Sequence, residues 1–138
     1  MGLRGYAPKN KPRIEFGQGV PPPPPWLDES GRKEYRRCAS ELKKAGAALQ
    51  KVDLHVLANY AQAAADSARL TEQIRQEGEI VTLPNGIRTA HPLVAVRTAA
   101  QKHMLACAAK LGFSPADRSR VPFDKAKVKN EFSQFLHA

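Results

Sequence analysis

The spacing of apolar and polar residues predicts a first helix from Glu29 to Ala45. Its apolar stripe recurs at helical steps, and Asp28 is placed to cap its first turn. Gly46 follows as a residue that ends a helix readily. The apolar stripe consists of Leu27, Tyr35, Cys38, Leu42, Ala45 and Leu49.

A second helix is predicted from about Val52 or Asp53 to Glu77, closed by Gly78. It is apolar on two sides, so both sides must be buried. In so short a chain we expect the second side to meet another subunit; the alternative is the central helix of a monomeric bundle. The first side is an alanine-rich seam that lets a neighbouring backbone come close, and it is the candidate oligomer interface. The seam comprises Leu54, Leu57, Ala61, Ala64 and Ala68, and the other side comprises Val56, Tyr60, Ala63, Leu70 and Ile74.

A third helix is predicted from Pro92 to Leu111. Pro92 suits the first helical position, Gly112 suits a left-handed end, and Ser114 is placed to cap one further short helix. The residues expected on its buried face are Leu93, Val96, Ala100, Met104, Cys107 and Leu111.

Between the second and third helices, two short β-prone runs flank Pro84-Asn85-Gly86. The Asn-Gly pair predicts a hairpin with a type I′ turn, in which both central residues have positive φ. The predicted fold is therefore mainly α: a small helical domain over 26–121 with a long central helix, an antiparallel third helix and a short β-hairpin between them.

The two ends of the chain differ from this domain in composition. Residues 1–25 combine basic residues, glycines and five consecutive prolines, and we expect a disordered basic arm that becomes polyproline II near the domain. A Pro-rich ligand for an adaptor domain is the alternative. Residues 122–138 form a charged tail with a possible short amphipathic helix.

The chain carries 22 Lys and Arg against 13 Asp and Glu, a net charge of +9. Such an excess favours a polyanionic partner, nucleic acid first, although a merely soluble basic protein is the simpler alternative. Two adjoining basic rows lie on the first helix, where internal ion pairs on a solvated face are the competing interpretation. The third helix carries Arg97, Lys102, His103 and Lys110 without an acid. The candidate DNA-binding residues are Arg4, Lys9, Lys11, Arg13, Arg32, Lys33, Arg36, Arg37, Lys43, Lys44, Arg97 and Lys102.

The residues of an active site are not recognisable in the sequence. There is no phosphate-binding Gly-rich loop with Lys and Ser or Thr, and the histidines are scattered. Cys38 and Cys107 fit no metal spacing and are interpreted as free thiols in a reducing cytoplasm; His103 and Cys107 stand one turn apart without a third ligand. We therefore expect no enzymatic activity, no metal and no cofactor. No apolar run is long enough to cross a bilayer, and no membrane partner is expected.

Three segments in order resemble the small subunit of phage DNA-packaging terminases, in the family with a proline-rich approach to the first helix. The resemblance covers roughly residues 20–121. The segments are PPPPPWLDESGRKEYRR (Pro21 to Arg37), LPNGIRTAHPLVAVRTAA (Leu83 to Ala100) and LGFSPADRSRV (Leu111 to Val121).

The resemblance implies a regulatory subunit that assembles as a ring, with roughly eight to twelve copies expected. It implies binding to the packaging-initiation site of double-stranded viral DNA, and recruitment and regulation of a large subunit that carries the ATPase and nuclease. It further implies action in the host cell cytoplasm during phage assembly, and absence from the mature virion. DNA contact through the arms, the outer helices or the inner wall of the ring stays open, because phosphate contacts position a protein without specifying a sequence. The alternative function is a monomeric or dimeric phage DNA-binding transcriptional regulator, which predicts two half-sites in place of a ring.

Overall fold

A computed structural model describes residues 16, 17, 19–47 and 49–120 of the chain. These residues form four α-helices, one short 3-10 helix and two short strands. They are α1 (Glu29–Lys44), η1 (Lys51–Asp53), α2 (Leu54–Glu77), β1 (Ile80–Thr82), β2 (Arg88–Ala90), α3 (Pro92–Leu111) and α4 (Pro115–Arg118). The predicted mainly helical fold, with a hairpin between the second and third long helices, is confirmed.

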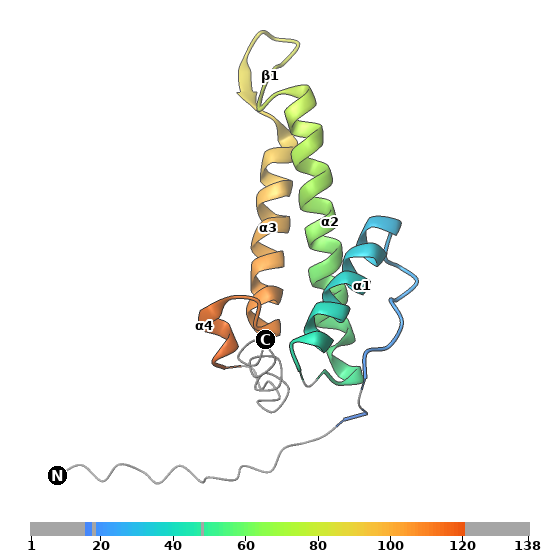
Figure 1. Cartoon of the computed structure of the whole chain (residues 1–138). Coiled ribbons are helices and arrows are strands. Elements are labelled where there is room, and N and C mark those ends of the chain that lie inside the picture. Colours follow the sequence, from blue (N-terminus) through green and yellow to red (C-terminus); the bar gives the residue numbers. More distant parts are fainter. Residues whose placement is uncertain (1–15, 18, 48, 121–138) are drawn as a thin grey trace, which may run out of the picture.

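The long helices α2 and α3 form an antiparallel rod with the β-hairpin at one end (Figure 1). Helix α1 packs against the other half of α2, on the side away from α3, and α4 lies beside the lower end of α3. Each element thus packs mainly on its neighbour in the sequence.

The main hydrophobic core lies where α1 crosses α2. Tyr35 and Leu57 are almost completely buried there, and Leu111 reaches the same core from the end of α3. Tyr60 on α2 and Phe113 beyond α3 meet edge to face, with ring centroids 4.8 Å apart. The residues of the core are Leu27, Tyr35, Cys38, Leu42, Leu57, Ala58, Ala61 and Leu111.

The helices end where the sequence predicts. Gly46 and Gly112 both have positive φ, and the residue after each donates its N–H five positions back, as in a Schellman motif. Asp28 caps α1 by accepting the Gly31 N–H at 2.7 Å, and Ser114 caps α4 by accepting the Asp117 N–H at 3.1 Å. These local signals operate independently of the rest of the fold, which is why the sequence alone located them.

The hairpin is confirmed, but its predicted type I′ turn is wrong. Gly86 has a φ of 82°, whereas no non-glycine residue in the described part of the chain has positive φ, so Asn85 does not adopt the conformation that type I′ requires. The Gly86 N–H instead bonds to the Leu83 carbonyl, and the Leu83 N–H bonds to the Ile87 carbonyl across a three-residue loop. The reason is Pro84: a two-residue turn would need its N–H in the ladder, and proline has none.

The base of the hairpin is held by His91, which is buried. Its Nδ1 accepts the Leu93 N–H at 3.1 Å and caps α3, while its Nε2 lies 2.7 Å from a carboxylate oxygen of Glu77 at the end of α2. Because Nδ1 accepts a hydrogen bond, the ring proton is on Nε2, which donates a hydrogen bond to Glu77. One imidazole therefore ties the end of α2 to the start of α3.

The face of α3 that meets α2 differs from the predicted one at one position. Val96 was expected to be buried, and this is wrong: its side chain is 52% exposed, while its neighbour Arg97 is half-buried. Position 97 lies four residues after Leu93 and three before Ala100, so it belongs to the same face of the helix as these two residues, the face that packs on α2.

The chain before α1 follows the helical domain closely wherever the structure describes it. The Tyr35 hydroxyl donates to the Pro21 carbonyl at 2.9 Å, Pro24 is buried, and the Lys51 N–H bonds to the Gly17 carbonyl at 2.7 Å. Leu27 is the anchor at the start of α1, with 2% exposure against 53% for Trp26. The proline run thus packs on the domain at Pro21 and Pro24, whereas residues 1–15 of the predicted arm lie outside the described residues.

Both apolar sides of α2 are covered in part by other helices of the same chain. Leu57 and Ala61 belong to the core with α1, whereas Leu70 and Ile74 are buried in the half of α2 that lies beside α3. The expectation that the second side meets another subunit is therefore wrong for Leu70 and Ile74, because α3 covers that side. Any contact with another subunit has to use surfaces that these buried residues leave free.

Candidate nucleic-acid interface

The acidic side chains are almost all engaged within the chain. Of the ten Asp and Glu residues that the structure describes, nine accept a hydrogen bond or form an ion pair through the side chain, and Glu79 is the exception. The engaged acids are Asp28, Glu29, Glu34, Glu41, Asp53, Asp66, Glu72, Glu77 and Asp117.

The basic side chains are not matched in the same way. Among the described residues, five Lys and Arg form an ion pair with an acid, and ten have no acid within 4.0 Å. The ten are Arg32, Arg36, Lys43, Lys51, Arg88, Arg97, Lys102, Lys110, Arg118 and Arg120. The surplus positive charge is therefore carried by residues that remain able to bind an anion.

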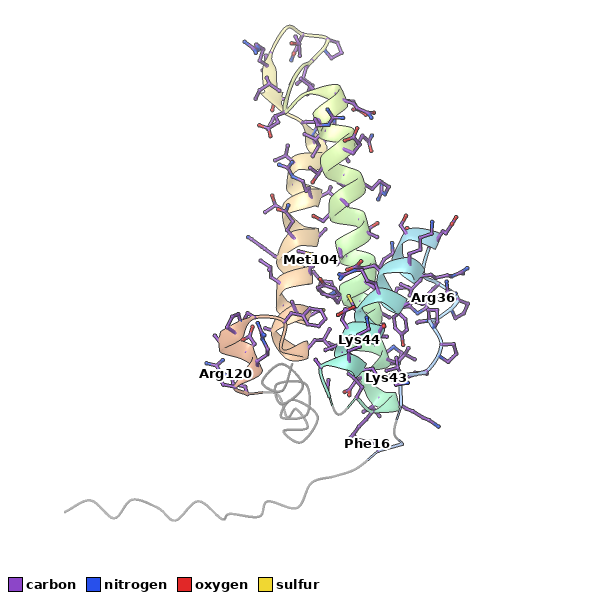
Figure 2. All side chains as sticks on the ribbon, viewed as in Figure 1. Phe16, Arg36, Lys43, Lys44, Met104 and Arg120 are labelled. Carbon is purple, nitrogen blue, oxygen red and sulfur yellow. The ribbon has the colours of Figure 1, made fainter. Side chains whose placement is uncertain are left out.

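The two predicted basic rows of α1 differ in their partners. In the first row Arg32 donates to the Pro25 carbonyl at 2.8 Å, while Arg36 and Lys43 are exposed without an acid partner. These two lie on the outer surface of α1 and near its end (Figure 2).

Each member of the second row pairs with an acid three or four positions earlier. Lys33 forms an ion pair with Glu29 at 3.1 Å and Lys44 with Glu41 at 3.0 Å, while the Arg37 guanidinium donates hydrogen bonds to both carboxylate oxygens of Glu34. The guanidinium is the main reason why the pKa of Glu34 is lowered. The interpretation as a solvated face with internal pairs thus describes this row, and the first row supplies the unmatched cations.

A cavity of about 310 Å³ opens beside the C-terminal half of α1, and it brings Arg37 together with Arg118 of α4. Phe113 and Tyr60 line it as well. Arg118 and Arg120 are exposed cations that sequence reasoning missed, because only the turn of the chain at Gly112 carries α4 toward α1. The cavity residues are Arg37, Cys38, Glu41, Leu42, Ala45, Tyr60, Gly112, Phe113 and Arg118.

The two thiols lie in different settings. Burial, together with the nearby Glu34 carboxylate, raises the pKa of Cys38 to about 12, so this thiol stays protonated at neutral pH and is a poor nucleophile. Cys107 is buried, with its Sγ 3.9 Å from the Nε2 of His103. No group of three or more His, Cys, Asp or Glu side chains in the described segments is arranged to hold a metal ion.

The candidate cations of α3 are not equivalent. Lys102 is exposed, whereas Arg97 is half-buried and its Nε is shielded from solvent without a hydrogen-bond partner among the described residues. Lys102 is the more accessible phosphate ligand, and Arg97 is partly withdrawn toward α2. The arm residues Arg4, Lys9, Lys11 and Arg13 lie outside the described residues.

The candidate oligomer-interface residues of α2 separate into two groups. Leu57 and Ala61 are buried in the protomer's own core and Leu54 packs against that core, whereas Ala64 is half-buried and Ala68 is exposed. Only the last two have surface available to a neighbour. The role of the set as an interface stays a prediction.

Fold and charge together define a small, basic, helical protein whose exposed cations are poorly matched by its own acids. The family model of the phage terminase small subunit matches residues 31–127, which is most of the chain. The chain therefore belongs to the phage terminase small subunit family, and the resemblance noted in the sequence is confirmed. In this family the small subunit is generally the non-catalytic, regulatory one, and membership connects the chain with phage DNA packaging.

Neither the curated proteins nor the solved structures contain a significant match. No helix in the described part of the chain is long and apolar enough to cross a membrane.

Proposed function

We propose that this chain is the small subunit of a phage terminase that binds the packaging-initiation site of double-stranded viral DNA. It does so as a ring of roughly eight to twelve copies, and it recruits and regulates the large subunit that carries the ATPase and nuclease. It acts in the host cell cytoplasm during phage assembly and is absent from the mature virion. The observation that carries the proposal is the family match over residues 31–127.

The charge distribution supports DNA as the ligand. Ten described cations lack an acid partner, while nine of the ten described acids are engaged, so a phosphate backbone can bind without competing against internal ion pairs. Three of these cations, Arg36 and Lys43 of α1 and Arg120 beyond α4, lie in the same half of the molecule (Figure 2).

A ring makes weak contacts effective. Each protomer contributes a few phosphate contacts, and linking the copies turns the later binding events into intramolecular ones, which raises the overall affinity without a new contact. The same arrangement leaves the large subunit free to engage the ring as a single unit.

Native mass spectrometry and DNA binding at several salt concentrations test the proposal together. We expect a single ring species, and an affinity for duplex DNA that falls steeply with added salt. A monomer or dimer that binds two half-sites would instead identify a transcriptional regulator. A ring without salt-dependent DNA affinity would leave a structural interaction protein.

A matched pair of variants locates the DNA surface. Replacing Arg36 and Lys43 with Ala removes two unmatched cations, and we expect the slope of log affinity against log salt to fall by about 2. Replacing Lys33 and Lys44 with Ala changes the net charge equally but removes ion-paired residues, and we expect a smaller effect. Equal effects of the two double variants would show that α1 acts only through its total charge.

A further inference from the structure

Among the residues that the structure describes, α3 is covered on one side only. The side chains that face α2 are buried or half-buried, as the position of Met104 illustrates (Figure 2). The residues at three- and four-residue steps on the other side are all exposed, and we call them the outer α3 face: Ala95, Ala99, Lys102, Ala106 and Ala109. Two larger apolar side chains flank it, Val96 at 52% exposure and Leu105 at 64%.

This arrangement is unusual for the surface of a helical protein. A surface helix normally turns charged and polar residues outward, and a helix that is apolar all round is normally buried. From Ala95 to Ala109 the outer α3 face runs for about 21 Å at the helical rise, and Lys102 is its single charge. Exposed Leu105 and Val96 make this more than a row of small residues, because their burial in a contact would be directly favourable.

Charge indicates what covers the face. Helix α3 contains Arg97, Lys102 and Lys110 and no acid, so its formal charge is positive. If two copies met through the same face in antiparallel fashion, Lys102 at its centre would meet its own counterpart, and like charges would oppose the contact. The partner surface therefore has to be a different one.

Helix α2 has the opposite net charge. Its formal charge is negative, because it carries Asp66, Glu72 and Glu77 against Arg69 and Arg75.

The side of α2 that packs on α1 extends beyond α1 toward the hairpin (Figure 1). Ala61 on this side belongs to the core with α1, and the residues that follow it at helical steps lie past the end of α1. There Ala65 is half-buried, while Ala68 and Glu72 are exposed; these three residues are the free α2 face. Two alanine-rich helix surfaces can approach closely, which suits the packing of one against the other.

We propose that the outer α3 face of one copy docks on the free α2 face of a second copy, head to tail. The inference rests on the proposed ring and assigns its interface. Because the two faces lie on different helices of the protomer, the contact is heterologous, and its repetition gives a ring when the rotation between neighbouring copies closes. The assignment gives Ala68 a partner and turns α3, with its Lys102, toward a neighbouring subunit.

Two complementary variants of the full-length chain test the pairing. The first replaces Ala99 and Ala106 with Glu, which blocks the outer α3 face with bulk and with charge repelled by Glu72. The second, Ala68→Trp, blocks the free α2 face with bulk alone and so adds no charge that could attract the Glu side chains of the first variant. We expect native mass spectrometry to find each variant as a single chain, with its helical circular dichroism signal retained.

The decisive sample is the equimolar mixture of the two variants. The first retains an intact α2 face and the second an intact α3 face, so a head-to-tail contact gives one species of two chains that cannot extend further. Ala116→Glu makes the same exchange at an exposed position of α4 and serves as the control, with the mass of the unmodified protein expected.

Each outcome separates this inference from the ring itself. An unmodified ring together with variants that still form it would overturn the interface and leave the ring standing. Single-chain variants that do not combine in the mixture would overturn the head-to-tail pairing. An unmodified protein that stays a single chain would overturn both the ring and the interface.

Discussion

Helices α1 and α3 both pack on α2, but they meet water in opposite ways. Helix α1 buries Tyr35, Cys38 and Leu42 on one side and presents six basic and three acidic residues elsewhere, as an amphipathic surface helix does. Helix α3 buries Cys107 and Leu111, and then exposes alanines together with Val96 and Leu105.

The difference shows where folding is complete within one chain and where it is not. The α1 side has large buried side chains inside and charged groups outside, so it leaves no apolar stripe that a further contact would bury. The α3 side leaves apolar surface in water, which the proposed contact between copies would bury. Three measurements test this contrast, from the largest expected effect to the smallest.

The same Leu→Ala exchange on the two helices tests the contrast most directly. We expect Leu42→Ala to lower the free energy of unfolding by about 3 kcal/mol at every protein concentration, because Leu42 is buried in the core. Leu105→Ala removes an exposed side chain, and we expect a loss below about 0.5 kcal/mol in dilute protein. Urea unfolding at several protein concentrations measures both.

If Leu105 lies in a contact between copies, the free energy of unfolding lost in Leu105→Ala increases with protein concentration, because assembly stabilises the folded chain by mass action. If Leu105→Ala lowered the free energy of unfolding in dilute protein as much as Leu42→Ala does, Leu105 would be buried within the protomer. The difference between α1 and α3 would then be refuted.

The cap of α1 gives a medium effect with a defined pH dependence. The Gly31 N–H and, after it, the Gln62 side chain lower the pKa of Asp28 below its ordinary value of 3.8. We expect Asp28→Ala to cost about 1 kcal/mol at pH 7. Because the folded pKa is depressed, this stabilisation is fully present above the ordinary pKa and is lost as the pH falls through the folded pKa.

In urea unfolding, the difference in free energy of unfolding between the unmodified protein and Asp28→Ala should therefore become smaller below about pH 4. Asp28→Asn is the control, since it keeps a capping oxygen and loses the titrating group. A gap that stays constant down to pH 2 would show that the charge of Asp28 contributes nothing to the cap.

The smallest effect is expected at the joint between α2 and α3. The pKa of Glu77 is lowered, first by its bond to His91 and then by its bond to Gln73, but its side chain is about half exposed. Glu77→Gln keeps an oxygen that can accept a hydrogen bond from His91, so we expect only a slight loss of stability. Faster amide hydrogen exchange confined to the hairpin would report the change, whereas faster exchange along all of α3 would mean that this joint holds the whole helix.

The boundaries of the elements could be predicted because their signals are local. Pro92 and Gly112 mark the ends of α3 correctly, and Asp28 and Gly46 mark those of α1 to within one residue. Which side of a helix faces inward is a different matter, because it depends on where the neighbour lies. Val96 and Arg97 exchange their expected roles for this reason.

The candidate site was predictable only in part. Ion pairs within α1 follow from sequence spacing, so Lys33 and Lys44 could be anticipated as matched cations. The approach of Arg118 to Arg37 could not, since it depends on the path of the chain through Gly112 in three dimensions. For the same reason, the seam of α2 looked uniform in sequence, although Ala61 is inside the protomer and Ala68 outside.

The sequential packing of the fold also has a consequence for how the chain acquires its structure. Helix α2 meets α1 before it and α3 after it, and β1 pairs with the adjacent β2, so most contacts join segments that are close in the sequence. Such topologies have low contact order and fold quickly, and they suit folding during synthesis, as each helix leaves the ribosome. The contact with the widest separation in sequence is the packing of Leu111, at the end of α3, into the core that α1 and α2 form, and it joins the three helices through one core.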